Sequence, residues 1–266
     1  MARTALLNIM MGAAIKAGRT LVRDFGEVEN LQVSVKGPAN FVSAADRKAE
    51  ETLIAELNKA RPGYSFLTEE RGAIAGSDSS HRWIIDPLDG TTNFLHGIPI
   101  FAVSIALERQ GEIVAGVVYN PVMNESFTAE RGGGTYFNDR RVRVAGRSRF
   151  ADCVVATGIP HLGRGPHAEY LAELREVMGG AAGVRRCGSA ALDLAWVAAG
   201  RFDAFWEHEL YPWDIAAGLL LVTEAGGIVT DEDGRGDMLT KGSVIAGNTQ
   251  VHRLLKTALE KARITA

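Results

Sequence analysis

The sequence predicts a layered α+β sandwich made of two lobes. Helical and strand-like patterns are mixed along all 266 residues, and a meander of short strands and turns fills the stretch from Phe101 to Val144. In the second half, helical patterns alternate with short strands. Because no linker separates the halves, we expect residues 1–148 and 149–266 to form two lobes that pack as one body.

The first half opens with an amphipathic helix. Apolar residues recur at helical spacing from Leu6 to Phe25, and Asn8 and Lys16 interrupt the apolar run that a signal peptide would need. No run approaches the roughly 18 apolar residues that cross a bilayer. We therefore expect a cytoplasmic protein with no membrane contact.

Further elements of the first half follow from periodicity and turn residues. A loop is predicted to open at Lys36-Gly37-Pro38. Residues 46–60 are predicted to form a helix that ends at Arg61-Pro62-Gly63. Strands are expected at Leu31–Val35, Ser65–Leu67 and His81–Ile85. Gly132-Gly133-Gly134 lacks the strand-to-helix setting of a nucleotide-binding loop, so it is predicted to be a hairpin turn.

The second half is predicted to alternate between the two element types. Helices are expected at Ala168–Met178, Ser189–Ala199 and Trp213–Ala225, and strands at Cys153–Ala156, Asp203–Trp206, Ile228–Thr230 and Ser243–Ala246. The two cysteines, Cys153 and Cys187, have small or apolar neighbours, which indicates buried thiols in a reducing compartment; the alternative is a disulfide.

The overall charge gives no sign of nucleic-acid binding. The formal net charge is −3, with 23% charged and 46% hydrophobic residues. A protein that binds nucleic acid through bulk charge is expected to be strongly basic. We therefore expect no direct nucleic-acid binding.

Acidic residues stand where core elements end. Glu69 and Glu70 follow a predicted strand, Asp86 ends the strand Trp83-Ile84-Ile85 with Asp89 in the loop after it, and Asp214 begins a helix. Each has an ordinary alternative as a turn, cap or surface residue. If several meet in one crevice, they need a cation. Oxygen ligands without His or Cys select Mg²⁺, Mn²⁺ or Ca²⁺ over zinc.

Two long motifs decide between these readings. WIIDPLDGTTNF, from Trp83 to Phe94, and WDIAAGLLLVTEAGG, from Trp213 to Gly227, resemble both signatures of the inositol monophosphatase family, with the bacterial SuhB-like members as the nearest type. LTEE, from Leu67, is similar to the family's Gly-Glu-Glu element, and KGPANFVSAAD, from Lys36 to Asp46, to its mobile loop. Asn40 stands where many relatives carry Asp. The resemblance implies a layered α-β-α-β-α sandwich of the sugar-phosphatase type.

The resemblance also implies a role for each matching position. The metal ligands would be Glu69, Asp86, the carbonyl of Leu88, Asp89 and Asp214. The catalytic residues that orient the attacking water would be Glu69 and Thr91, with Asp46 behind Thr91. The substrate would contact Asp89, Gly90, Thr91, Thr92, Gly188, Ser189, Ala190 and Glu207. The cofactor would be two or three Mg²⁺, with Mn²⁺ as a substitute and Li⁺ as an inhibitor. The reaction would be a direct in-line displacement on a phosphate monoester, most of all myo-inositol 1-phosphate.

Several alternatives remain at this level. A haloacid-dehalogenase phosphatase is disfavoured because Asp86 and Asp89 have two residues between them where that class has one. The same chemistry could serve fructose 1,6-bisphosphate, 3′-phosphoadenosine 5′-phosphate, histidinol phosphate or NADP, because pocket residues decide the substrate. A non-enzymatic role in transcription antitermination, with a transcription-factor partner, is a third reading. A homodimer is expected from the family.

Overall fold

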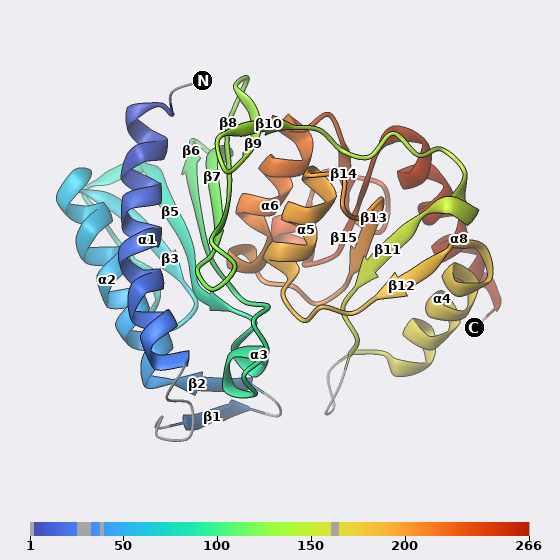
Figure 1. Cartoon of the computed structure of the whole chain (residues 1–266), viewed down its shortest axis with the longest axis horizontal. Helices are drawn as coiled ribbons and strands as arrows, with labels where there is room; N and C mark the ends of the chain where they lie inside the picture. The colour runs from blue at the N-terminus through green and yellow to red at the C-terminus, as the bar shows by residue number, and fades with distance from the viewer. Residues whose placement is uncertain (1–2, 26–32, 38–39, 161–164, 266) are drawn as a thin grey trace.

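The computed structural model describes residues 3–25, 33–37, 40–160 and 165–265; the side chains of 33–37, 40–43 and 265 lie outside what it describes. Five layers follow one another across the molecule (Figure 1). Helices α1 and α2 come first, then an eight-stranded sheet, helices α5 and α6, a five-stranded sheet, and helices α4 and α8. The predicted layered α+β sandwich is confirmed.

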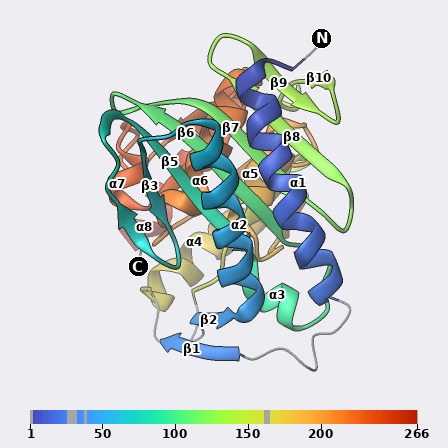
Figure 2. The ribbon, with the colours of Figure 1, turned by 90° about the vertical axis from the view of Figure 1, so that its left-hand side faces the viewer.

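Helices α1 (Ala5–Phe25) and α2 (Ala44–Ala60) cover the outer face of the larger sheet (Figure 2). In α1 the buried residues, among them Met10, Ala14 and Leu21, recur at the spacing of one helical face. Among the described helices, α1 is long and apolar enough to cross a membrane. Because its apolar side belongs to the hydrophobic core, α1 is a core helix, as the sequence predicts.

The eight-stranded sheet contains the predicted meander. Its order is β10-β9-β8-β7-β6-β5-β3-β4, and every neighbouring pair is antiparallel except β3 and β5. The strands are β3 (Tyr64–Thr68), β4 (Gly72–Ile74), β5 (Asp78–Asp89), β6 (Ala102–Arg109), β7 (Glu112–Asn120), β8 (Glu125–Glu130), β9 (Gly134–Phe137) and β10 (Arg140–Val142). Gly132 and Gly133 lie in the turn between β8 and β9, as predicted, and Gly134 begins β9.

Helices α5 (Ala190–Ala198) and α6 (Pro212–Glu224) form the middle layer. All of α5 is buried, as is α6 from Ile215 to Val222, because sheets cover both sides of this layer. The contacts are close: a Cβ on Gly218 would lie 2.6 Å from the Cβ of Leu194, and one on Gly116 would lie 3.0 Å from the carbonyl oxygen of Ala217. These glycines let α6 approach α5 and β7.

The five-stranded sheet has the order β12-β11-β13-β15-β14. Its strands are β11 (Val154–Thr157), β12 (Gly183–Arg185), β13 (Ala204–Glu207), β14 (Ile228–Thr230) and β15 (Val244–Gly247), with β11 parallel to β12 and β13 and the other pairs antiparallel. Helices α4 (His167–Gly180) and α8 (Thr249–Thr265) cover its outer face and share an apolar core with it.

The sequence reading of several shorter elements is incomplete or wrong. The loop expected at Lys36 begins inside a strand, because β1 (Val33–Gly37) pairs with β2 (Asn40–Ser43); the side chain of Asn40 and the placement of Pro38 lie outside what the structure describes. Several elements were not expected from the sequence: the strands β2, β4 (Gly72–Ile74) and β12 (Gly183–Arg185), and also α3 (Thr91–Leu95), the 3-10 turn η2 (Phe150–Asp152), α7 (Met238–Lys241) and α8. The shorter ones have too few residues for a periodic pattern.

Candidate active site

A bulge in β5 brings Asp86 and Asp89 to one face of the sheet. The expectation that the strand ends at Asp86 is wrong, because β5 continues to Asp89. Asp86 pairs with Ser104 of β6 and Asp89 with Ala102, so two residues of β5 face one of β6. In a regular strand, residues three apart point to opposite faces. The extra residue of the bulge turns Asp86 and Asp89 to the same face of the sheet. The Leu88 N–H, inside the bulge, donates to Asp86 Oδ1 at 2.8 Å.

Asp214 enters the same space from the first turn of α6. Its Oδ2 accepts a hydrogen bond from the N–H of Tyr211 at 2.8 Å, which caps the helix. The hydroxyl of Ser104, the partner of Asp86 in β6, donates to the carbonyl of Trp213 at 3.3 Å. The start of α6 is therefore tied to the strand pair that carries Asp86.

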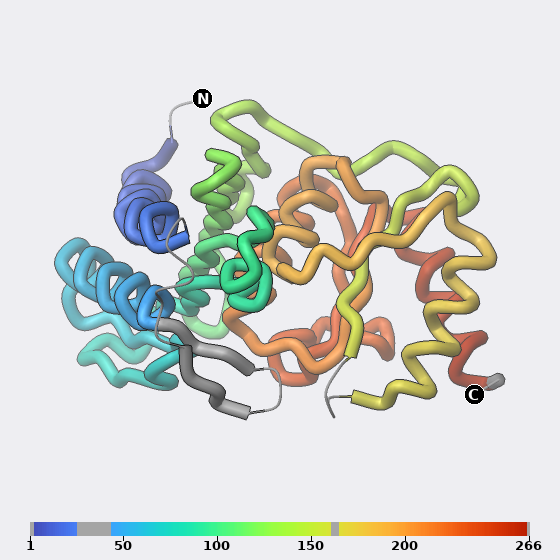
Figure 3. The backbone as a smooth tube through the Cα atoms, turned by 60° about the horizontal axis from the view of Figure 1, so that its bottom comes forward, coloured from blue at the N-terminus to red at the C-terminus, as the bar shows by residue number. Residues whose placement is uncertain are grey.

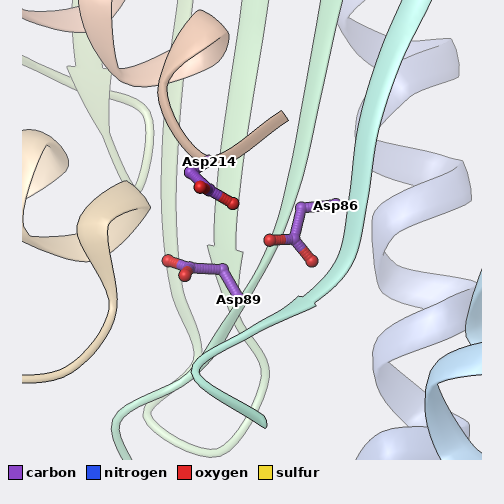
Figure 4. A group of neighbouring side chains, drawn as sticks. All are labelled: Asp86, Asp89 and Asp214. Carbon is purple, nitrogen blue, oxygen red and sulfur yellow. The ribbon is translucent and has the colours of Figure 1, made fainter. Parts of the chain in front are cut away.

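Oxygen atoms of Asp86, Asp89 and Asp214 lie within 4.8 Å of one another, and the carboxylates face each other (Figure 4). Asp86 is 2% exposed and Asp89 9%. Burial, then the charges of Glu69, Asp89 and Asp214, raises the pKa of Asp86 well above its usual range. Burial, then Asp89, does the same to the pKa of Asp214, and burial raises the pKa of Asp89 to about 6.

This donor set fits a hard divalent cation. The three carboxylates offer oxygen atoms alone, and no positive group is among the causes that shift their pKa values. Buried carboxylates that repel one another need either protons or a cation. The acidic cluster is a metal-binding site by this chemistry, as the sequence predicts.

Glu69 lies beside this cluster without being one of its three members. It follows β3 directly, and its N–H is 3.3 Å from the carbonyl oxygen of Ile85, the residue before Asp86. Its charge raises the pKa of both Asp86 and Asp214. It also lines the adjoining cleft.

A tight turn joins β5 to α3 and presents Thr91. The hydroxyl Oγ1 of Thr91 lies 3.1 Å from Asp46 Oδ1 and 3.1 Å from the carbonyl oxygen of Leu88. Gly90 has a φ of 95°, and a Cβ there would lie 2.9 Å from the carbonyl oxygen of Ile100. Only glycine adopts this conformation readily. Figure 3 shows the short helix that follows, in green, between the outer blue helices and the orange helices of the middle layer.

The segment before α5 holds Asp89 in place. Asp89 Oδ2 accepts hydrogen bonds from Ser189 Oγ at 2.5 Å and from the N–H of Ala191 at 2.8 Å. The side chain of Asn93 crosses between the layers, donating to the carbonyls of Ile100 and Cys187 at 2.7 and 2.8 Å. The hydroxyl of Ser189 therefore donates its hydrogen to Asp89.

A cleft of about 490 Å³ opens beside the carboxylates. Its lining includes Glu69, Asp89 and Asp214, the expected substrate-contact residues Gly188, Ser189, Ala190 and Glu207, and Arg186. Burial, then the charges of Asp193 and Asp89, raises the pKa of Glu207 to about 8. Gly158 makes room for this group, since a Cβ there would lie 1.8 Å from a Glu207 oxygen.

Comparison with known proteins agrees with this geometry. The Inositol monophosphatase family matches residues 2–263. The chain belongs to this family. It is 68% identical to a protein of Mesorhizobium japonicum named "Inositol-1-monophosphatase", over 98% of each chain, and 62% identical to one of Rhizobium meliloti with the same name and coverage. The resemblance drawn from the two motifs is confirmed, and with it the prediction of a phosphoric monoester hydrolase.

Other family members carry a second name. A crystal structure of "extragenic suppressor protein suhB" from Bartonella henselae superposes with a TM-score of 0.95 at 62% identity, covering 97% of this chain and 99% of that one. A protein of Pseudomonas aeruginosa named "Nus factor SuhB" is 46% identical over 96% of each chain. The predicted SuhB-like type within the family is thereby confirmed.

Sequence reasoning missed some residues of this family site. Asp193 of α5 is 1% exposed, and burial, with Asp89 among the smaller causes, raises its pKa well above the usual range. Arg186 lines the cleft and lowers the pKa of both Asp193 and Glu207. The signal for Asp193 was present, because it is the one charged residue in an otherwise apolar helix.

Proposed function

We propose that the protein hydrolyses phosphate monoesters with Mg²⁺, and that myo-inositol 1-phosphate is its preferred substrate. The observation that carries the proposal is the convergence of three carboxylates from β5 and α6, each buried or half-buried, beside a cleft. The names of the relatives at 68% and 62% identity support the substrate.

In this proposal, Asp86, Asp89 and Asp214 would hold one Mg²⁺, and Glu69, Asp86 and the carbonyl of Leu88 would hold another. A third, more weakly bound ion would lie by Glu69. Three divalent ions exceed the four carboxylate charges by the charge of one phosphate monoester dianion. When bound, Mg²⁺ makes hydroxide available near neutral pH and stabilises the leaving oxygen; Mn²⁺ is a substitute with the same ligand preference.

The protein's own groups orient the water and the phosphate. The hydroxyl of Thr91 donates to Asp46, so its oxygen is free to accept a hydrogen bond from the attacking water. Glu69 is the carboxylate that takes the proton which this water loses as it attacks phosphorus. Gly90, Thr91 and Thr92 face the phosphate at the turn that begins α3. The displacement is direct and in line, with no covalent enzyme intermediate.

Substrate selection is assigned to the cleft. Glu207 stands at the end of β13 and accepts a hydrogen bond from a ring hydroxyl next to the phosphate, with Gly188, Ser189 and Ala190 beside it. The alternatives remain fructose 1,6-bisphosphate, 3′-phosphoadenosine 5′-phosphate, histidinol phosphate and NADP.

A phosphate-release screen tests this function. With Mg²⁺, inositol 1-phosphate should give a higher kcat/KM than fructose 1,6-bisphosphate or 3′-phosphoadenosine 5′-phosphate, and EDTA should remove the activity. Glu207→Ala should reduce the discrimination by roughly 1–3 kcal/mol, because it removes a buried acceptor. A nucleotide substrate ranked first would refute the substrate, and activity retained in EDTA would refute the metal chemistry.

The remaining proposals concern the setting of the enzyme. We propose a homodimer, two lobes that meet near residues 147–150, and a cytoplasmic, reducing compartment, which agrees with the two free thiols Cys153 and Cys187. The name "Nus factor SuhB" of a 46% identical relative favours a transcription-factor partner as a second role. A pull-down with transcription factors beside a phosphate-release assay on the same sample separates the two roles.

A further inference from the structure

Helix α2 carries two buried carboxylates toward the active site. Asp46 and Glu50 are each 0% exposed and stand one turn apart, so their side chains share a helix face with Ala45, Ala49 and Leu53. Asp46 contacts Thr91. Glu50 has no role in the function proposed above.

Glu50 holds a peptide group in the turn after β3. Its Oε2 accepts a hydrogen bond from the N–H of Glu70 at 2.9 Å. Its Oε1 is buried and makes no hydrogen bond with the described residues, but lies 3.3 Å from Arg71 Nε. Burial raises the pKa of Glu50, while the Glu70 N–H, Thr68 and Arg71 act in the opposite direction and favour its charged form. Through its hydrogen bond to the Glu70 N–H, Glu50 fixes the position of the backbone between Glu69 and Glu70.

This peptide group is the one that links Glu69 to Glu70. The peptide on the other side of Glu69 is also held, because the Glu69 N–H points to the carbonyl of Ile85 in β5 at 3.3 Å. Both peptides that flank Glu69 are thus fixed, one by the strand that carries Asp86 and one by Glu50. These two bonds fix the backbone from which the Glu69 side chain projects.

We propose that Glu50 is a positioning residue that aims Glu69 at the metal, so that α2 orients Thr91 through Asp46 and Glu69 through Glu50. The inference rests on the proposed metal role of Glu69. Groups that orient metal ligands typically contribute 10- to 100-fold to metal affinity or activity, so a change of this order is expected when Glu50 no longer reaches Glu70.

Two substitutions separate reach from charge. Glu50→Asp keeps the charge but is one methylene shorter, and Glu50→Gln keeps the reach and a carbonyl acceptor but loses the charge. Glu51→Gln is the matched control: Glu51 is the next residue of α2, its side chain is 68% exposed, and it pairs with the same Arg71 at 3.0 Å. Because the Glu70 N–H donates to Glu50, the Glu51→Gln protein should behave as wild type.

The first measurement is amide hydrogen exchange of the peptide covering Glu69 to Gly72 in the metal-free protein. The second is the Kd of Mn²⁺, followed by electron paramagnetic resonance. We expect Glu50→Asp to exchange faster in this peptide and to weaken Mn²⁺ binding by roughly tenfold or more. Glu50→Gln should stay within about threefold of wild type in Mn²⁺ affinity, because it retains the acceptor.

The outcomes decide the matter either way. A folded Glu50→Asp protein with wild-type exchange and Mn²⁺ affinity overturns the proposal, as does a Glu50→Gln protein that loses tenfold or more in Mn²⁺ affinity. If Glu50→Asp does not fold, the Glu50→Gln result alone decides. Wild-type protein without Mg²⁺-dependent phosphatase activity would refute the proposed function, while the exchange measurement would still report on the contact between Glu50 and Glu70.

Discussion

Glu207 should make the metal-free protein less stable as pH rises. The carboxyl is half-buried in the cleft at the end of β13, and burial, then the charges of Asp193 and Asp89, raises its pKa from 4.5 to about 8. Below pH 4.5 the group is protonated in both the folded and the unfolded state. Between pH 4.5 and 8 the folded protein keeps a proton that the unfolded chain has released, so the free energy of unfolding falls as pH rises through this window.

The size of the effect follows from the same two values. A pKa difference of this order corresponds to roughly 5 kcal/mol when the group is fully ionised, and partial access of solvent to the half-buried carboxyl makes this an upper bound. Glu207→Gln removes the ionisation and keeps the shape. We therefore expect the variant to match wild type near pH 5 and to be more stable by several kcal/mol at pH 9.

Urea unfolding in EDTA at pH 5, 7 and 9 measures this difference. The difference between wild type and variant reports the ionisation of Glu207 together with its coupling to Asp193, Asp89 and Asp214, whose own burial lowers the stability of both proteins. Glu209→Gln, an exposed residue of the same cleft, serves as the control and should show no such pH dependence. Stability curves of wild type and Glu207→Gln that run parallel from pH 5 to 9 would refute the reasoning.

Three further outcomes are expected. Asp86→Asn and Asp214→Asn should each lower turnover by several orders of magnitude while the circular dichroism spectrum stays native; retention of more than about a tenth of wild-type turnover would contradict the metal assignment. Li⁺ should inhibit at millimolar concentration in competition with Mg²⁺, because it fits the same oxygen donors with half the charge, and no effect up to about 100 mM beyond a KCl control would count against the site of Asp86, Asp89 and Asp214. Gly90→Ala should cost about 1–3 kcal/mol of stability and lower kcat at least tenfold, because its φ is 95° and its Cβ would meet the carbonyl of Ile100 at 2.9 Å; thermal unfolding and steady-state rates measure both.

Periodicity and turn chemistry were enough to predict the longer elements. The apolar spacing in α1 and α2, the strand–turn–strand pattern of β6 and β7 and the apolar run of α6 all appear in the structure close to the expected bounds. Helix α8 was not assigned, although Val251, Leu255 and Leu259 mark one buried face of it.

The site was predictable by a different route. Nothing local in the sequence shows that Asp86 and Asp89 point the same way, because in a regular strand they would lie on opposite faces, and the bulge that unites them appears only in the pairing with β6. The approach of Asp214 depends on how α6 packs between the sheets, so only the family resemblance could predict it. Glu50 had a local signal, since it follows Asp46 by one helical turn on a face of small apolar residues.

The tight packing of α6 constrains how enzymes of this architecture can diverge. Gly116 and Gly218 let β7 and α5 lie close to this helix, so a larger residue at either place would shift the helix that carries Asp214 in its first turn. Exposed residues of the cleft, such as Ile159 and Tyr211, are not constrained by this packing. Substitutions at the rim of the cleft can therefore change which leaving group is accepted without moving α6. The carboxylates that bind the metal cannot change independently of the packing of the core.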